Sequence, residues 1–364
     1  MGSQNVCDIN ILQPSTLWIN KRCYRVLLPN SNISGSYMED DVYPEYTYKD
    51  ELECQLDFDI PFDQLSNGKF KTSFAVASSY LPYIIGGRGA TKHRIENETY
   101  TQIKIPSKGQ VGDVVIIGKD MKTVRQARIK IELLVDQAKR RQPFTHFISI
   151  PFNQDVIQES FIKFKNEALE RFGEDRGVES SLFQNQLKLH MTICPLVLSD
   201  DRERQNAVKA LKDCHLEIMN EYIQVEPLRI EIKGIEYLND DPSEVDVLYG
   251  KVQSVSWAYS LQDIVDDLVR KLVKSGVASK QYESVKLHVT LMNTLFRTDK
   301  DGTSNNTVNK DKDRETFDAR NILKEFKDYY FGEVEISELH LSVRYSTASN
   351  GYYTSSCKLS LLPR

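Results

Sequence analysis

The chain has 364 residues, 40% of them hydrophobic and 27% charged, and its formal net charge is −5. A chain of this length can form two domains that each bury a hydrophobic core. It has neither an apolar run of about 18 residues nor a basic N-terminal stretch followed by an apolar one, so no membrane span or secretory signal is indicated, and we expect a soluble intracellular protein.

Residues 1–65 show little apolar periodicity. They include an acidic, tyrosine-rich stretch, Tyr37–Asp59, with nine acidic residues and one lysine. This composition predicts a poorly ordered N-terminal arm. The arm could cover a basic part of the chain, dock a partner or simply be a solvated tail, and the sequence leaves these alternatives open.

Residues 66–142 are predicted to form an RNA-binding module. Its expected elements are a strand, two short helices, two strands and a long helix, over residues 70–77, 79–85, 90–98, 101–105, 114–118 and from about 120 to 140. From Lys69 to Arg141 there are fifteen lysines and arginines against six acidic residues, a local net charge of +9. A basic block in an acidic chain indicates a polyanionic partner. A basic but merely solvated surface is the alternative.

A glycine-rich loop, Gly86-Gly87-Arg88-Gly89, lies between the two predicted short helices. Glycines let a nucleic-acid backbone approach closely, and the amides that open the next helix attract phosphate. Lys92 and Arg94 add positive charge beside the loop. Such a loop alone is weak evidence, because glycine turns are common. With the surrounding element order, it resembles the KH family, which implies a type I βααββα fold and a single-stranded RNA or DNA ligand.

The remaining region, residues 143–364, contains an apparent duplication. A strand at 144–152, a helix carrying Ile157, Phe161 and Phe164 on one face, and a strand at 187–193 are followed by a similar series, with strands at 245–252 and 285–291 around a second helix. A polar segment from Arg297 to Arg314 is predicted to be a long surface loop.

One polar motif occurs once in each repeat. Lys188-Leu-His190-Met-Thr192-Ile returns 98 residues later as Lys286-Leu-His288-Val-Thr290-Leu. In a strand, residues two apart share a face, so lysine, histidine and threonine are predicted to line a cleft while the alternate residues face a core. An isolated strand histidine is more often structural. Two matching triplets in a duplicated unit favour a functional role.

The two HxT motifs resemble the 2H phosphoesterase superfamily of LigT-like domains. The resemblance implies two lobes related by a pseudo-twofold axis, with His190 and His288 on opposite sides of one groove. Histidine titrates near neutral pH and can act as a base toward a hydroxyl or as an acid toward a leaving oxygen. The Thr192 and Thr290 hydroxyls would stabilise the phosphate oxygens. This scheme needs no metal or cofactor.

Other candidate residues receive ordinary structural interpretations. The six cysteines are scattered without zinc-ligand spacing and are expected to be reduced thiols. Of the four further histidines, His93 is expected at the surface or beside a phosphate, and structural roles are expected for His146, His215 and His340. Stacking on a base is open, with core packing the default, for Tyr80, Tyr83, His93, Phe183, Tyr249, Trp257 and Phe296.

The expected fold is therefore α+β, with a type I KH domain followed by a bilobal, duplicated 2H phosphoesterase fold. Four segments, Gln142–Phe147, Gly234–Pro242, Asp246–Tyr249 and Met292–Arg297, resemble a family of subunits of a nuclear transcription coactivator complex. The resemblance implies helicase and ubiquitin-binding partners, a role in the response to alkylation damage, and a nuclear location, with a cytoplasmic pool left open. The sequence leaves two functions as alternatives: an RNA phosphodiesterase, or an RNA-binding adaptor that recognises a phosphate end without cleaving it.

Overall fold

The computed structural model describes residues 16–19, 22–25, 60–107, 109–110, 112–223, 227–238, 240–255, 260–279, 283–297 and 315–363. Strands β1 (Thr16–Ile19) and β2 (Arg22–Arg25) pair in an antiparallel hairpin. The prediction of a poorly ordered arm did not foresee this hairpin. The acidic stretch Tyr37–Asp59 and nearly all of the predicted loop after Arg297 lie outside the described residues.

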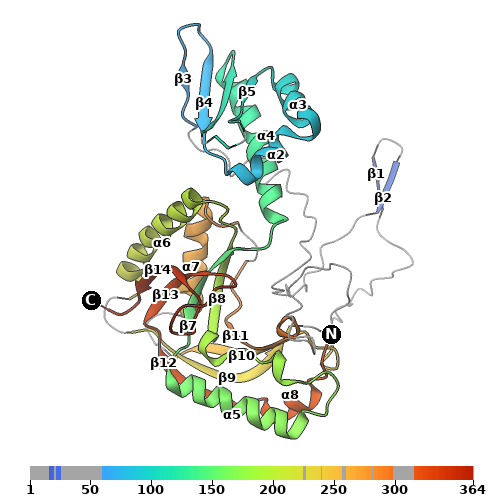
Figure 1. Ribbon diagram of the computed structural model, residues 1–364, viewed down its shortest axis with the longest axis vertical. Helices are drawn as coiled ribbons and strands as arrows, with labels where there is room; N and C mark the ends of the chain where they lie inside the picture. The colour runs from blue at the N-terminus through green and yellow to red at the C-terminus, as the bar shows by residue number, and fades with distance from the viewer. Residues whose placement is uncertain are drawn as a thin grey trace, which may run out of the picture. The chain divides into compact units, whose positions relative to one another are not determined.

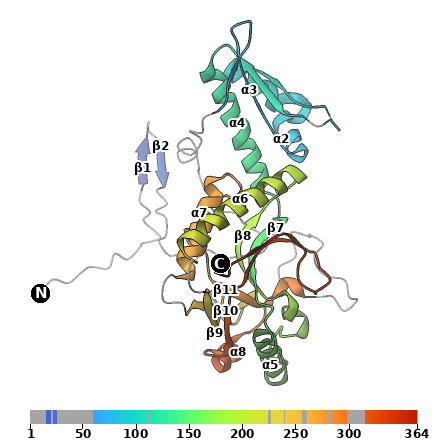
Figure 2. The ribbon, with the colours of Figure 1, turned by 90° about the vertical axis from the view of Figure 1, so that its left-hand side faces the viewer.

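The KH region is a four-stranded antiparallel sheet in the order β3-β4-β6-β5, covered by helices (Figures 1 and 2). Helix α4 packs on β4 and β6, and α2 and α3 pack on α4. The bounds are β3 Asp63–Gln64, β4 Phe70–Phe74, α2 Leu81–Ile85, α3 Ala90–Thr99, β5 Gln102–Lys104, β6 Val114–Gly118 and α4 Met121–Arg140. From β4 onward this is the expected βααββα order. The edge strand β3 was not predicted.

Helix α4 shows how the sequence specifies this region. Asp120 precedes it in an extended conformation and accepts a hydrogen bond from the Thr123 amide at 2.9 Å, which caps the helix. Val124, Ala127 and Ile131 then recur on one face and are fully buried. They pack against isoleucines of the sheet and of the two shorter helices.

The second domain contains two four-stranded antiparallel sheets, ordered β14-β13-β7-β8 and β11-β10-β9-β12 (Figure 1). The first sheet joins strands from both ends of the domain, β7 (His146–Pro151) and β8 (His190–Leu196) with β13 (Glu338–Val343) and β14 (Ser355–Ser360). The second consists of β9 (Arg229–Tyr237), β10 (Val247–Ser254), β11 (His288–Asn293) and β12 (Tyr330–Glu335). Strands β8 and β11, each at the edge of its sheet, contact one another.

In the described part of this domain, the sheets are covered by the helices α5 Asp155–Phe172, α6 Asp201–Glu221, α7 Leu261–Lys274 and α8 Arg320–Phe326. Helix α5 follows β7 in the chain but packs on β12 of the other sheet, beside α8 (Figure 1). Phe164 on α5 lies among four aromatic rings at 5.0–6.2 Å between centroids, those of Phe183, Phe326, Tyr329 and Phe331. Both sheets therefore share one hydrophobic core.

The predicted motif strands begin three residues too early. Residues Gln186–Lys188 form a 3-10 turn, because the Asn185 side chain accepts a hydrogen bond from the Leu187 amide at 2.9 Å. In the second motif, Asp266 on α7 accepts the Val285 amide at 2.7 Å, and β11 begins only at His288. Lys188 and Lys286 thus precede their strands. Among the described residues, no helix has the length and apolar character of a membrane span.

Candidate active site

His190 and His288 are the first residues of the neighbouring strands β8 and β11. The alternate residues Met191 and Val289 are buried in the core, and the histidines themselves are only 8% and 7% exposed. Thr192 and Thr290 are half-buried. We call the four residues His190, Thr192, His288 and Thr290 the paired-histidine site. The fold thus joins the two halves of the duplication at their matching polar positions.

Both imidazoles are held in the same way. The Nδ1 atom of His190 lies 2.7 Å from the carbonyl oxygen of Lys188, and Nδ1 of His288 lies 2.8 Å from that of Lys286. A carbonyl can only accept, so each Nδ1 must carry the proton and donate it. In the neutral ring, the lone pair therefore lies on Nε2. The same tautomer at both positions suits either histidine to accept a proton through Nε2.

Burial favours the neutral form of both rings. It lowers the pKa of His190 to about 4, against a hydrogen bond to Lys188 that raises it, and the charges of His288 and Lys188 lower it further. The pKa of His288 is lowered mainly by burial and also by Lys286. Both histidines are therefore bases in the protein without ligand. A negatively charged phosphate beside them would raise the pKa of each, because it stabilises imidazolium.

The two threonine hydroxyls are available to a ligand. Within the part of the chain that the structure describes, neither Thr192 nor Thr290 forms a side-chain hydrogen bond. Each faces a residue of the neighbouring strand, Ser149 in one lobe and Tyr249 in the other. A hydroxyl without an internal partner can donate to a phosphate oxygen, which is the role predicted for both.

The motif lysines do not simply extend into solvent. Lys188 is half-buried, with its Nζ 4.8 Å from the ring centroid of Tyr353. Lys286 is also half-buried, with its Nζ 4.5 Å from the ring centroid of Tyr249. Burial lowers the pKa of both lysines. Their charge is thus held next to the histidines instead of being fully solvated.

Apart from Lys188 and His288, the neighbours of His190 are uncharged aromatic and hydroxyl groups. Phe147 lies 5.1 Å and Tyr352 lies 6.4 Å from the imidazole, centroid to centroid. The Tyr352 hydroxyl is 3.0 Å from the Ser149 hydroxyl, which is 3.0 Å from that of Ser342. All three hydroxyl residues are buried. They were missed by sequence reasoning because Ser342 and Tyr352 come from a remote part of the chain without a motif.

Around His288 the neighbours are charged. Tyr249 meets the imidazole edge-on at 5.3 Å and donates its hydroxyl proton to Glu236 at 2.8 Å. Glu236 also pairs with Lys251 at 3.4 Å. Lys251 is the register partner of His288 on β10. Tyr249 is only 2% exposed, so the face of its ring is not open to stack on a base. Glu236 and Lys251 carried no sequence signal.

The other histidines have structural surroundings. His340 is buried in β13 between Glu338, 2.7 Å away, and Ser355, 3.1 Å away. His146 is buried at the start of β7, and His215 contacts the carbonyl of Ser360 at 2.6 Å. Among the described residues, no group of three or more histidine, cysteine or acidic side chains is arranged to hold a metal ion.

The candidate RNA-binding loop has the backbone that its glycines suggest. Gly86 and Gly89 have φ angles of +70° and +83°, and Arg88 between them has φ +52°. A Cβ on Gly86 would overlap the Thr91 hydroxyl. No side chain caps α3, which begins at Ala90. The Ala90 amide donates to the Gly87 carbonyl, so the amides after it in the first turn are the ones that can meet a phosphate.

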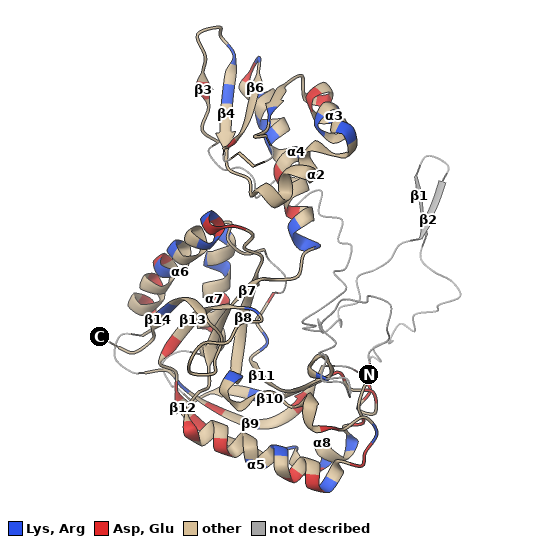
Figure 3. Ribbon diagram, in the orientation of Figure 1, with Lys and Arg blue, Asp and Glu red and all other residues tan. Residues whose placement is uncertain are grey.

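The charge near this loop is less than the sequence suggested. Figure 3 shows Lys and Arg along β4, α3 and α4 of the KH region. Lys92, however, lies 3.6 Å from Glu96, and His93 lies 3.3 Å from the same carboxylate. Glu96 therefore reduces the contribution of Lys92 to phosphate binding. Tyr80 is fully buried, and Tyr83 is 45% exposed, so only Tyr83 of these two can stack.

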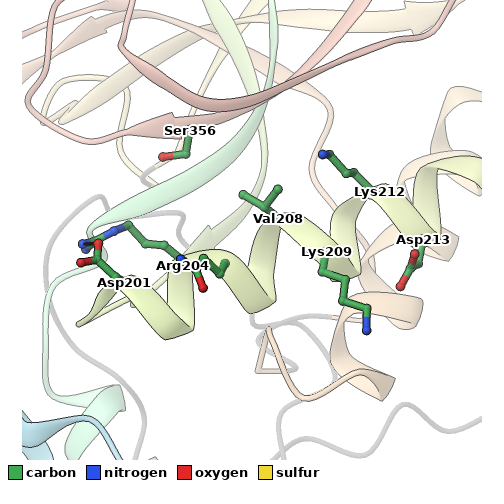
Figure 4. A pocket seen from close by; sticks show the side chains of 8 residues that line it. Asp201, Arg204, Val208, Lys209, Lys212, Asp213 and Ser356 are labelled. Atoms are coloured by element: carbon green, nitrogen blue, oxygen red, sulfur yellow. Dashed lines mark hydrogen bonds and ion pairs between the residues drawn. The ribbon is translucent and has the colours of Figure 1, made fainter. Parts of the chain in front are cut away.

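A separate surface pocket lies over α6 (Figure 4). Arg204, Lys209 and Lys212 line it together with Asp201 and Asp213, so its charges are mixed. None of its residues belongs to the paired-histidine site, and its chemistry indicates no particular ligand.

Fold and site together define a KH domain joined to a 2H phosphoesterase-like domain. Residues 144–361 match the family model of the AKAP7 2'5' RNA ligase-like domain, and residues 71–133 match that of the KH domain. The chain is 39% identical over 353 residues to activating signal cointegrator 1 complex subunit 1 of Mus musculus, which covers 95% of this chain and 98% of that protein. The chain therefore belongs to the family of that subunit.

Solved structures give weaker likenesses. E. coli LigT complexed with 3'-AMP is 14% identical, covers 60% of this chain and 99% of its own, and has a TM-score of 0.37. The first KH type I domain of human vigilin is 20% identical, covers 24% of this chain and 90% of its own, and has a TM-score of 0.20.

Proposed function

We propose that this protein is an RNA phosphodiesterase in which His190 and His288 transfer the protons and Thr192 and Thr290 hold the phosphate. One observation carries the proposal: two distant HxT motifs meet on neighbouring strands with both imidazoles fixed as the same tautomer. Such an arrangement matches a reaction that needs one base and one acid. Each positioned proton transfer is worth roughly 10²- to 10⁴-fold in rate.

In the proposed reaction, Nε2 of one neutral histidine takes the proton of a ribose 2′-hydroxyl or of water. The freed oxygen attacks phosphorus, and a P–O bond breaks on the opposite side. The second histidine, protonated at Nε2, gives its proton to the departing oxygen. Hydroxyl groups of the threonines donate to the nonbridging oxygens as their negative charge grows. Two imidazoles and two hydroxyls complete this scheme, so it calls for no metal.

The KH region is proposed to capture single-stranded RNA. The residues that would meet the RNA backbone are Gly86, Gly87, Arg88 and Gly89 of the loop, with Lys92 and Arg94 beside them. The positive φ angles of the loop and the uncapped start of α3 support this role. Because of its family, we further propose that the protein works in the nucleus as a subunit of the activating signal cointegrator 1 complex, with helicase and ubiquitin-binding subunits, in transcription and the alkylation-damage response.

An adaptor that binds a phosphate end without turnover is the second candidate. One observation favours it: burial lowers the pKa of both histidines, so neither is a ready acid in the protein without ligand. The enzyme requires the arriving phosphate to raise the pKa of one imidazole so that this ring can act as the acid. An adaptor requires no such rise, because it transfers no proton.

The deciding experiment incubates the full chain, in EDTA, with end-labelled single-stranded RNAs and with 2′,3′-cyclic nucleotides. The matched control is the double variant His190→Ala, His288→Ala. Turnover that is lost only in the variant establishes the phosphodiesterase and identifies its substrate. RNA binding without turnover in the unmodified protein supports the adaptor.

A further inference from the structure

Each histidine of the paired-histidine site has the same two neighbours, a tyrosine and then a lysine. The Tyr353 ring lies edge-on to His190, with centroids 5.4 Å apart and an interplanar angle of 83°. The Tyr249 ring lies edge-on to His288, with centroids 5.3 Å apart and an angle of 72°. The motif lysine of each half rests over the face of the corresponding tyrosine. Two Lys–Tyr–His arrangements thus exist, one in each lobe.

These arrangements are not copies made by the duplication. Tyr249 lies in β10, as the register partner of Thr290. The matching position in the first lobe, opposite Thr192 on β7, is Ser149. Tyr353 comes instead from the connection between β13 and β14. Two unrelated parts of the fold therefore supply the same ring at the same place, which points to a shared physical requirement.

The requirement follows from how a histidine side chain is held. The Nδ1–carbonyl hydrogen bond fixes the tautomer, yet the ring can still tilt about that bond. A tyrosine ring packed perpendicular to the imidazole restricts this tilt and therefore the direction of Nε2. A cation over the tyrosine face holds the tyrosine in place. Lys188 does more, since its Nζ also donates to the Ser346 carbonyl at 3.1 Å and to the Thr347 hydroxyl at 2.9 Å, in the connection that carries Tyr353.

We propose that Lys188 and Lys286 are positioning residues that act on His190 and His288 through Tyr353 and Tyr249. In each lobe, the lysine fixes the position of the tyrosine ring, and the tyrosine ring fixes the orientation of the imidazole plane. The positive charge of the lysine also favours the neutral form of the imidazole. In support, the charged groups that affect His190 are Lys188 and His288, and Lys286 affects His288, all in the direction that lowers the pKa. The inference rests on the proposed function, because that function gives the histidines their role as acid and base. The effect of each lysine on its histidine can nevertheless be measured without a substrate.

The test is an NMR titration of the full chain labelled with ¹³C-histidine. Lys188→Met removes the charge but keeps much of the side-chain bulk, and we expect an upward shift of the His190 pKa, with no change at His288. Lys286→Met should give the reciprocal result. Lys188→Arg, which keeps the charge, should restore the His190 titration. Lys358→Met is the matched control, because this exposed lysine on β14 is the register partner of His340 and affects the pKa of that histidine but not of His190 or His288.

A second variant tests the tyrosine directly. Tyr353→Leu keeps the lysine charge and removes the aromatic edge, so we expect the ring resonances of His190 to move and broaden while those of His288 stay. The inference is overturned if the His190 pKa in Lys188→Met equals that in Lys358→Met, if Lys188→Arg fails to restore it, or if Tyr353→Leu leaves the His190 resonances unchanged. Since no substrate is present, absence of turnover would reject the phosphodiesterase without affecting these results.

Discussion

His190 and His288 stand 98 positions apart in the sequence, yet they begin the neighbouring strands β8 and β11. Burial is the main cause that lowers the pKa of His190, and a proton on His288 would lower it further, so protonation of the folded protein at this site is unfavourable. The same holds for other buried histidines, whose pKa burial also lowers: His146 and His340.

Stability is therefore expected to fall in mild acid. Above the unfolded pKa of about 6.5, both states are neutral at these rings. As the pH drops below that value, these histidines become protonated in the unfolded chain but stay neutral in the folded protein, until the pH reaches the folded pKa, about 4 for His190. The free energy of unfolding therefore falls by at most about 1.4 kcal/mol per pH unit for each such histidine. Urea unfolding at pH 7 and pH 5 measures it. His190→Gln should reduce the difference in unfolding free energy between the two pH values, and an unchanged difference would contradict the prediction.

Removing either threonine hydroxyl should slow the proposed reaction. Thr192→Val keeps the shape of the side chain but removes the donor to the phosphate, and a fall in kcat of roughly 10²- to 10³-fold is expected by analogy with the loss of one oxyanion donor. Thr192→Ser, which keeps a hydroxyl, should retain most of the rate. Equal rates for Thr192→Val and the unmodified protein would remove this residue from the mechanism. The same pair of changes applies at Thr290.

The loop glycines offer a matched pair of substitutions. Gly86 has φ +70°, and an added Cβ would overlap Thr91, so Gly86→Ala should destabilise the KH region by roughly 1–3 kcal/mol. Gly87 has no atom within 4 Å of an added Cβ, so Gly87→Ala should be nearly neutral. Thermal unfolding compares the two variants. Equal effects would mean that the backbone of the loop differs from the one described.

RNA capture by the same loop is tested by reversing its charge. Gly87→Asp combined with Arg88→Asp places two carboxylates where the phosphates are expected, and the affinity for single-stranded RNA should fall sharply. Binding to the unmodified protein should weaken with salt, by about 0.7 in log K per unit of log salt for each phosphate neutralised. Fluorescence anisotropy measures both. Affinity unaffected by the double change would place the RNA elsewhere.

The sequence predicted local structure well wherever one segment determines it. Helix α4 has its cap and its apolar face within twenty-one residues, and β6 was predicted at its observed bounds. The HxT residues could be proposed because a repeated motif is visible without a structure. The strand starts were missed because Asn185 and Asp266 bind the backbone just before each strand through their side chains.

The surroundings of the histidines could not be predicted in the same way. Tyr352 and Tyr353 reach His190 from more than 160 residues away, and nothing in their local sequence marks them. Glu236 belongs to a segment that reads as an ordinary strand. These contacts depend on tertiary packing alone. Glu96 is a different case, because its pairs with Lys92 and His93 are neighbours at i,i+4 and i,i+3 on one helix, a spacing that the sequence itself contains.

The sheet that carries His190 is built from the beginning and the end of its domain, since β13 completes it beside β7. On the ribosome, β7 and β8 are made early but must wait for residues 338–360 before their sheet can close. The second sheet, whose strands all fall between Arg229 and Glu335, can close sooner. The lobe whose first strands are synthesised first is thus the last to complete its sheet. Loss of the final strands would therefore disrupt the surroundings of His190, although these strands lie about 150 residues further along the chain.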